Sequence, residues 1–290
     1  MKPLLLTLLF APLALASAQT AVLNSYAPPK DPTILASTFV DWDSLIAKPT
    51  PTGEVRQVFD NPTRTLDKLE VHVTTLNPGM ESHPIHRHSW EEILLVTQGD
   101  FEVSINGRKR HAGPGSMVFF AANDPHNATN VGLTPATYYV INFVSDLSHN
   151  ESAESAESAP SAAERAVPGK LASTVIDCNA LPQTPTPTGS RVSVLSSPTL
   201  TFLTLESHIT TLNAGQSTAA DMIDHNDEFV LIKSGSVEVK VNGVSSRMHA
   251  GSVLFWAADD KRSLRNLGAT PASYQVIRVT TAKSPKPPAN

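Results

Sequence analysis

Three histidines fall within six positions of residues 82–99, which read SHPIHRHSWEEILLVTQG. Two glutamates and an apolar run follow them, and a glycine closes the segment. Neutral imidazoles and a carboxylate are suitable ligands for a borderline divalent metal ion. The segment is therefore either part of a metal site or a polar loop that happens to be rich in histidine.

The spacing of these residues decides how they could meet. Alternate residues of a strand share a face, so His86 and His88 would point the same way, and Glu92 has the same parity. A straight strand rises about 3.3 Å per residue, which would carry Glu92 about 20 Å from His86. We therefore predict a turn between Ser89 and Glu91 that returns Glu92 on a neighbouring strand.

The surrounding sequence predicts strands rather than helices. Residues 92–110, EILLVTQGDFEVSINGRKR, read as two strands joined at Gly99 and Asp100, and Asn106 with Gly107 suits a tight hairpin. The later runs SMVFFAA and TYYVINFV have strand length, and no helical period of useful length occurs. We predict an all-β protein built of barrels or sandwiches.

The chain also contains the same module twice. Residues 69–79 (LEVHVTTLNPG) and 205–215 (LESHITTLNAG) are identical at eight of eleven positions. The offset of 136 residues then continues without a gap through Gly99 and Gly235, Gly107 and Gly243, Gly115 and Gly251, and Asn130 and Asn266. A register held over that length indicates a tandem duplication.

The first copy resembles the cupin family. Gly79, His86, His88, Glu92 and Gly99 match the first cupin motif, in which glycine precedes His-x-His, three residues, glutamate, six residues and glycine. The spacer after Gly79 is one residue longer than the commonest form. No ligand position is affected by this difference.

The second cupin motif follows in the expected order. Gly115, His126 and Asn130 match it, while its usual proline and second glycine are replaced by Ala121 and Asn123. With both motifs present, and with the duplication, the chain resembles a bicupin. The resemblance implies two tandem double-stranded β-helix (jelly-roll) barrels.

The resemblance also implies a metal site in the first barrel. Its ligands would be His86, His88, Glu92 and His126. Such a set suits one divalent ion per chain, manganese or iron first, with zinc and nickel as alternatives, and leaves open positions if the ion is six-coordinate. A solvated loop would not explain a fourth histidine supplied by a second motif.

Neighbouring polar residues receive other interpretations. His83 could sit at the mouth of the pocket, but its place beside Pro84 favours a surface loop. Glu91 has the opposite parity to Glu92 and should face outward or an interface. His72 and His208 are equivalent in the two copies, which favours a structural or interface role for both.

The second copy lacks the ligand set. The 136-residue offset places Met222, Asp224 and Arg262 where the first copy has histidines, and only Glu228 is retained. Arginine cannot be deprotonated to bind a metal, so we predict that Arg262 fills the vacated space and pairs bidentately with Glu228, and with Asp224. The alternative is a relocated metal site formed by Asp221, Asp224, His225 and Glu228. We expect the second copy to be structural or to bind a ligand without metal.

The ends and the middle of the chain set the predicted domain limits. Residues 1–18 combine Lys2, an apolar stretch and a small-residue cleavage site, as a signal peptide does. We predict barrels at 36–146 and 171–283, joined by a flexible linker at 147–170 that is small, polar and repetitive; a short exposed helix is its alternative. The mature protein would be secreted or periplasmic, without a membrane segment.

Composition narrows the partners. The net charge is −5 and the isoelectric point about 6.0, which gives no case for nucleic acid or an anionic membrane surface. One cysteine, Cys178, excludes a disulfide within the chain. A small-molecule substrate or ligand is the expected partner, and a homo-oligomer is left open.

Two functions fit this sequence. The first is a secreted metal-dependent oxidoreductase or lyase, of the oxidase, dioxygenase or decarboxylase type, acting on a small organic molecule. The second is a non-catalytic cupin that retains metal and binds a small molecule or serves as a structural protein. An intact ligand set inside one barrel favours the enzyme, although no catalytic residue can be assigned beyond the ligands.

Overall fold

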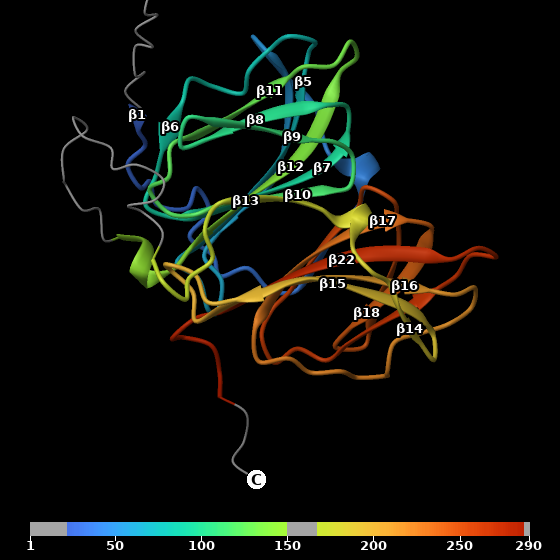
Figure 1. The fold of residues 1–290 in the computed structure, drawn as a ribbon. Helices are drawn as coiled ribbons and strands as arrows, with labels where there is room; N and C mark the ends of the chain where they lie inside the picture. Colours follow the sequence, from blue (N-terminus) through green and yellow to red (C-terminus); the bar gives the residue numbers. More distant parts are fainter. Residues whose placement is uncertain (1–21, 150–166, 287–290) are drawn as a thin grey trace, which may run out of the picture.

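The computed structural model describes residues 22–149 and 167–286 (Figure 1). The predicted signal peptide (1–18) lies outside this part of the chain, and so does most of the predicted linker. Regular structure in the described residues is almost entirely β-strand, with three short 3-10 helices. The prediction of an all-β fold with two tandem jelly-roll barrels is confirmed. No described helix has the length and apolar character needed to cross a membrane.

The first half supplies most of two sheets. Among the described residues, one sheet has five strands in the order β1-β6-β11-β8-β9, and the other has seven in the order β13-β10-β7-β12-β5-β4-β3. The elements of this half are β1 (Val22–Leu23), β2 (Thr38–Val40), η1 (Trp42–Ser44), β3 (Lys48–Thr50), β4 (Gly53–Asn61), β5 (Lys68–Leu76), β6 (His86–Arg87), β7 (Glu91–Gln98), β8 (Phe101–Ile105), β9 (Arg108–Ala112), β10 (Ser116–Phe120), β11 (His126–Asn130), β12 (Ala136–Val144) and η2 (Asp146–His149).

The second half repeats this plan. Its described strands form a seven-stranded sheet in the order β14-β15-β16-β22-β17-β20-β2 and a three-stranded sheet in the order β19-β18-β21. The elements of this half are β13 (Thr174–Asp177), η3 (Cys178–Ala180), β14 (Thr184–Thr186), β15 (Gly189–Ser197), β16 (Thr204–Leu212), β17 (Asp227–Ser234), β18 (Ser236–Val241), β19 (Val244–His249), β20 (Val253–Trp256), β21 (Arg262–Asn266) and β22 (Ala272–Thr280).

The first strand of each predicted barrel pairs with a strand of the other barrel. β2 pairs antiparallel with β20 in the second barrel. β13 pairs antiparallel with β10 in the first barrel (Figure 1). The exchanged strands, Thr38–Val40 and Thr174–Asp177, are equivalent under the 136-residue offset. The first strand of each predicted barrel therefore completes the sheet of its neighbour, and backbone hydrogen bonds join the two barrels.

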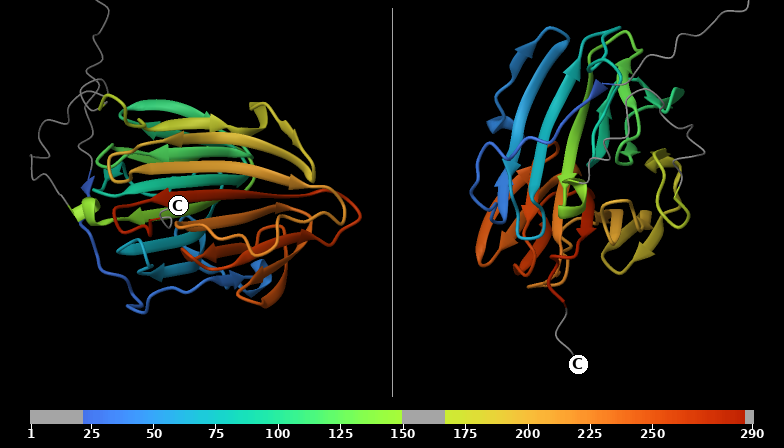
Figure 2. Two further views of the ribbon diagram at one scale, coloured as in Figure 1. Left: turned by 90° about the horizontal axis from the view of Figure 1, so that it is seen from below. Right: turned by 90° about the vertical axis from the view of Figure 1, so that its left-hand side faces the viewer.

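The two seven-stranded sheets also share a core. Both faces of β7 are buried, because Ile93 and Leu95 face the other barrel while Leu94 and Val96 fill their own barrel. Figure 2 shows this two-barrel arrangement from two further directions. The largest side chains of the shared core are Phe59, Phe119, Tyr139, Phe143, Phe202, Phe229 and Phe255.

Buried carboxylates anchor the junction. Glu91 is 1% exposed and accepts hydrogen bonds from the backbone N–H groups of Leu200 (2.9 Å) and Thr201 (3.3 Å). Its equivalent, Asp227, accepts from the N–H (3.2 Å) and the hydroxyl (2.7 Å) of Thr65. Of the two orientations expected for Glu91, the interface is the one found.

Candidate metal centre

Three strands and a bend bring the four predicted ligands together. His86 of β6 lies directly opposite His126 of β11 in an antiparallel pair. The chain bends at residues 89–90, and β7 then presents Glu92 to the same space. One potential ligand atom from each of His86, His88, Glu92 and His126 lies within 4.8 Å of those of the other three.

Asn123 helps to aim His126. Its φ of 66° lies in the left-handed region, where glycine and asparagine are the residues that fit most easily. Its backbone N–H donates to the carbonyl of His88 at 2.7 Å, which ties the turn before β11 to the other ligand segment. Asparagine thus adopts the conformation that the usual motif glycine would take.

Backbone carbonyls fix the tautomers of two histidines. The Nδ1 atom of His88 lies 2.9 Å from the carbonyl oxygen of Trp90, and that of His126 lies 2.7 Å from the carbonyl oxygen of Asp124. A carbonyl only accepts, so each Nδ1 carries the hydrogen. Nε2 is therefore the nitrogen of each ring that faces Glu92, whose Oε2 atom lies 3.2 Å from His88 Nε2 and 3.9 Å from His126 Nε2, and it is the nitrogen that would bind an ion.

The four side chains fit a divalent ion. Each is at least 93% buried, yet His86 Nδ1 and His126 Nε2 have no hydrogen-bond partner. Burial, reinforced by neighbouring imidazoles, lowers the pKa of His86 to about 3, so this ring is neutral at physiological pH. Burial alone would raise the pKa of Glu92, but His126 and His88 outweigh it and hold that pKa well below its usual range. A neutral His86, an ionised Glu92 and unsatisfied buried nitrogens suit the binding of a metal ion.

A cavity of about 230 Å³ adjoins the four residues, and two further histidines line it. The ring of His83 lies edge-on to that of His86, with centroids 3.8 Å apart. The surface-loop interpretation of His83 is therefore wrong. The following residue, Pro84, does not direct the ring to solvent, and its carbonyl oxygen lies 3.0 Å from His83 Nδ1. His72, for which a structural or interface role was expected, also lines the cavity.

His72 belongs to a chain of hydrogen bonds that reaches a ligand. Its Nδ1 atom lies 2.8 Å from Glu70, whose carboxylate also accepts from the side-chain amide of Asn142 at 2.8 Å. The Asn142 oxygen accepts from the Trp90 indole at 3.0 Å, and this indole stacks on His88 with centroids 4.2 Å apart. Burial opposes a charge on His72, but Glu70 outweighs it and raises the pKa of this histidine. The raised pKa favours the protonated form of His72 beside the ligand set.

The second barrel contains an ion pair at the equivalent position. Arg262 Nη2 lies 2.7 Å from Glu228 Oε2 and 3.8 Å from Asp224, and the guanidinium lies over the Trp256 ring at 5.1 Å. The predicted replacement of a metal by Arg262 is thus what the structure contains. The bidentate geometry is wrong, because Nη1 and Nε of Arg262 have no partner.

Sequence reasoning missed Arg278. This residue binds both Asp224 and Glu206, so a second cation shares the carboxylates of the pocket. The signal was present in the sequence, because Arg278 is the equivalent of Asn142. The proposed relocated site does not form, since His225 instead contacts Asp259 at 2.6 Å. One other group in the described chain could hold an ion, Asp41, Asp43 and His249, but none of its residues is buried.

Fold and site together define a tandem β-barrel protein whose described residues include a buried histidine-rich pocket that could bind a metal. The cupin domain family matches residues 72–142 and again residues 208–278, and the chain is a bicupin of this family. No curated protein sequence matched it.

Solved structures share the fold at low sequence identity. AerE from Microcystis aeruginosa is 14% identical, with a TM-score of 0.60 over 83% of this chain and 98% of that one. Oxalate decarboxylase from Bacillus subtilis is 14% identical, with a TM-score of 0.63 over 86% and 78%. The formate complex of Lactobacillus farciminis oxalate decarboxylase is 15% identical, with a TM-score of 0.63 over 89% and 90%.

Proposed function

We propose that this bicupin is a secreted or periplasmic metalloenzyme that acts on a small organic acid in its first barrel. The reaction would be of the oxidase, dioxygenase or decarboxylase type. One observation carries the proposal: four buried potential ligands and His72 line a single cavity. Buried nitrogens without hydrogen-bond partners are destabilising, so their presence beside a cavity favours a binding function over a purely structural one.

His86, His88, Glu92 and His126 would hold one divalent ion, manganese or iron by preference. When bound, such an ion supplies Lewis acidity or a site for dioxygen activation. The protein's own part is to keep His88 and His126 in the tautomer that leaves Nε2 free. The carbonyl groups of Trp90 and Asp124 do this.

The cavity favours a compact, anionic substrate. Its volume of about 230 Å³ is small, and its polar lining includes His72, His83 and Asn142. Glu70 binds the Nδ1 atom of His72, which leaves Nε2 as the nitrogen that can donate to a substrate carboxylate. The oxalate decarboxylases that share the fold act on a small carboxylate, which agrees with this substrate class.

His72 would serve as the positioning and proton-donating group. The cavity lining contains no described lysine or arginine, and the raised pKa of His72 favours the protonated ring, which would offset the charge of a bound carboxylate. The Glu70–Asn142–Trp90 hydrogen bonds hold its ring in place. Phe120, stacked on His126 at 4.0 Å, and Leu94 close the apolar side of the cavity.

Metal analysis and a substrate screen test this proposal. Protein purified from its own compartment should contain one manganese or iron ion per chain by elemental analysis. Small organic acids and phenols would then be screened for oxygen uptake and carbon dioxide release. The His126→Ala variant should lose both metal and turnover, whereas exchanging the exposed His111 for alanine should change neither. A metal-free native protein, or turnover that survives His126→Ala, would contradict the proposal.

A further inference from the structure

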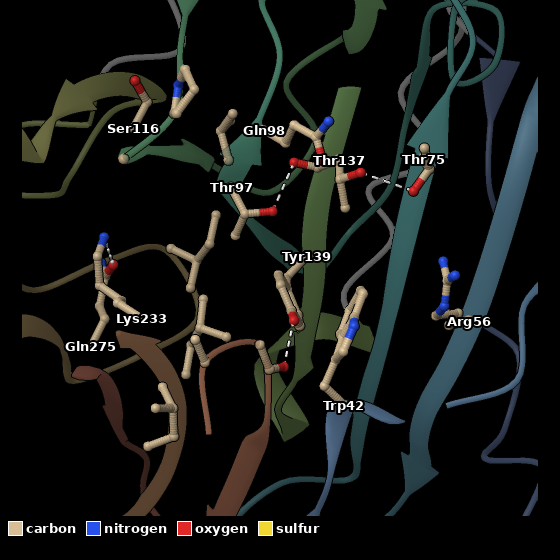
Figure 3. Close-up of a pocket in the computed structure, with 18 of the residues that line it drawn as sticks. Trp42, Arg56, Thr75, Thr97, Gln98, Ser116, Thr137, Tyr139, Lys233 and Gln275 are labelled. Atoms are coloured by element: carbon tan, nitrogen blue, oxygen red, sulfur yellow. Dashed lines mark hydrogen bonds between the residues drawn. The ribbon is translucent and has the colours of Figure 1, made fainter. Parts of the chain in front are cut away.

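A second cavity, of about 760 Å³, lies between the two barrels (Figure 3). It shares no lining residue with the metal cavity. Its walls come from both halves of the chain, including β7 and β12 of the first half and β17 and β22 of the second.

The cavity lies where the duplicated copies face each other. Its lining contains both members of six pairs related by the 136-residue offset. These pairs are Leu95 and Leu231, Val96 and Ile232, Thr97 and Lys233, Pro114 and Ala250, Gly115 and Gly251, and Tyr139 and Gln275. A dimer of identical barrels would carry the same residue twice at such an axis. Fusion in one chain has allowed two of these pairs to differ in chemistry.

One of these differing pairs introduces a charge, because Lys233 is the equivalent of the uncharged Thr97. The Nζ atom of Lys233 has one hydrogen-bond acceptor among the described residues, Gln275 Oε1 at the long distance of 3.5 Å (Figure 3). No aspartate or glutamate is among the groups that shift its pKa. Burial lowers the pKa of Lys233, as expected for an ammonium without a counter-ion. The side-chain amide of Gln275 also donates to the Ser207 hydroxyl at 3.2 Å, and this hydrogen bond keeps Gln275 from moving closer to Lys233.

The other charges of the lining cancel. Arg56 and Glu54 form an ion pair at 2.5 Å, and the Arg56 guanidinium lies 5.1 Å from the centroid of the Trp42 ring. Glu54, Arg56 and Lys233 are the charged residues among those that line the cavity. The net charge of the lining is therefore positive, and a ligand anion would supply the missing partner of Lys233.

The remaining walls suit a flat apolar body. Trp42 packs against the backbone of Gly251 and lies 6.3 Å from the ring of Tyr139, whose hydroxyl donates to the Gly251 carbonyl at 2.5 Å. Thr75, Thr97 and Thr137 form a row of hydroxyls on another wall (Figure 3). Apolar walls with a few placed polar groups are typical of small-molecule sites.

We propose that this interbarrel cavity binds a small organic monocarboxylate with a flat apolar body, and that Lys233 pairs with the carboxylate. The aromatic wall formed by Trp42 contacts the body, and the threonine hydroxyls accept or donate the remaining hydrogen bonds. The site is separate from the metal centre, so it does not depend on the reaction proposed above.

Titration calorimetry with benzoate tests the proposal on the full-length mature protein. Benzoate should bind saturably, while benzyl alcohol, which has the same ring without the charge, should bind more weakly. The Lys233→Met variant should weaken benzoate binding about 30-fold or more, because it removes one partner of a desolvated charge pair. Lys233→Arg should retain most of the binding. The exposed Lys240→Met is the matched control and should leave it unchanged.

Two further measurements test whether benzoate binds in the interbarrel cavity rather than at the metal site. The His126→Ala variant removes a metal ligand and should bind benzoate as the parent does. Benzoate should also quench tryptophan fluorescence in the parent but not in Trp42→Phe. Unaltered melting of Lys233→Met would show that its loss of binding is not unfolding. The proposal would be overturned by absent binding of benzoate, by equal binding to Lys233→Met, or by binding that is lost only in His126→Ala.

Discussion

Asn142 and Arg278 occupy equivalent positions on β12 and β22, and the pKa values of the neighbouring histidines are shifted in opposite directions. Asn142 shares Glu70 with His72, so the carboxylate raises the pKa of that histidine. Arg278 instead engages Glu206 directly. Burial, together with Arg191 and Arg278, then lowers the pKa of His208 to about 3. A single exchange between the copies thus accompanies a raised histidine pKa in the first barrel and a lowered one in the second.

Exchanging these residues should exchange the histidine states. In Asn142→Arg, the new guanidinium would take Glu70 from His72, and the pKa of His72 should fall below its ordinary value of 6.5. The reciprocal Arg278→Asn should raise the pKa of His208. Histidine proton resonances followed by NMR against pH measure both. Unchanged titration of His72 in Asn142→Arg would refute the role given to Glu70.

Glu92 and Glu228 are equivalent, but replacing each with glutamine should affect different properties, metal content for Glu92 and stability for Glu228. Glu228→Gln leaves Arg262 buried without its charged partner, which should cost about 3–5 kcal/mol of unfolding free energy. Metal content of the first barrel should stay near the parent level. Glu92→Gln should instead lose metal, with a smaller change in the stability of the metal-free protein.

Denaturant unfolding and elemental analysis on both variants separate these effects. Loss of metal in Glu228→Gln at parental stability would mean that the second barrel takes part in the metal site.

The second barrel should accept a metal once its cations are removed. The changes Met222→His, Asp224→His and Arg262→His restore the ligand types around Glu228. The structure adds a fourth requirement, Arg278→Asn, because Arg278 Nη1 lies 3.9 Å from Glu228 Oε1 and would repel an ion. Elemental analysis should give two ions per chain for the fourfold variant and fewer for the threefold one. Equal metal content in the two variants would argue against this role of Arg278.

His208 should make the protein sensitive to acid. Its folded pKa of about 3 lies below the ordinary 6.5, so the unfolded chain binds this proton more readily than the folded chain. The contribution of His208 to stability is complete above pH 6.5 and is lost as the pH falls toward 3. At pH 4 the loss should be on the order of 2 kcal/mol, allowing for partial exposure of the ring. The variant His208→Gln should show a flatter decline of unfolding free energy between pH 6.5 and 4.

His72→Gln is the matched control for this experiment. The pKa of His72 is raised rather than lowered, so removing it should not flatten the acid decline. If His208→Gln and the parent protein lose stability in parallel, then His208 is protonated in the folded state.

Cleavage of the linker should leave the barrels together. The exchanged strands β2 and β13, and the shared core around Phe59 and Phe255, hold the halves by backbone hydrogen bonds and by apolar contact. A protease site placed within 150–166 should give two fragments that stay in one particle by light scattering. Separation of the fragments without denaturant would show that the exchange contributes little.

Much of this protein could be predicted from its sequence. The strand-length runs, the 136-residue repeat and the motif spacing indicated two β-barrels, and the ligand types indicated a metal pocket in the first. Arg262 could be placed beside Glu228 because both lie at ligand positions of the repeated motif. These properties depend on residue type and periodicity, which the duplication preserves.

Tertiary structure decided what depends on contacts across strands and barrels. His72 lies far along the chain from His88, and its place in the cavity follows from the position of β5 next to β12 in the sheet. The exchange of β2 and β13 could not be predicted from hydrophobic periodicity. A strand has the same alternation of apolar and polar residues whichever sheet it joins. Lys233 lines a cavity only because the two barrels pack against each other. Which groups share a desolvated space is fixed by packing, and the same side chain takes a different charge state in each such space.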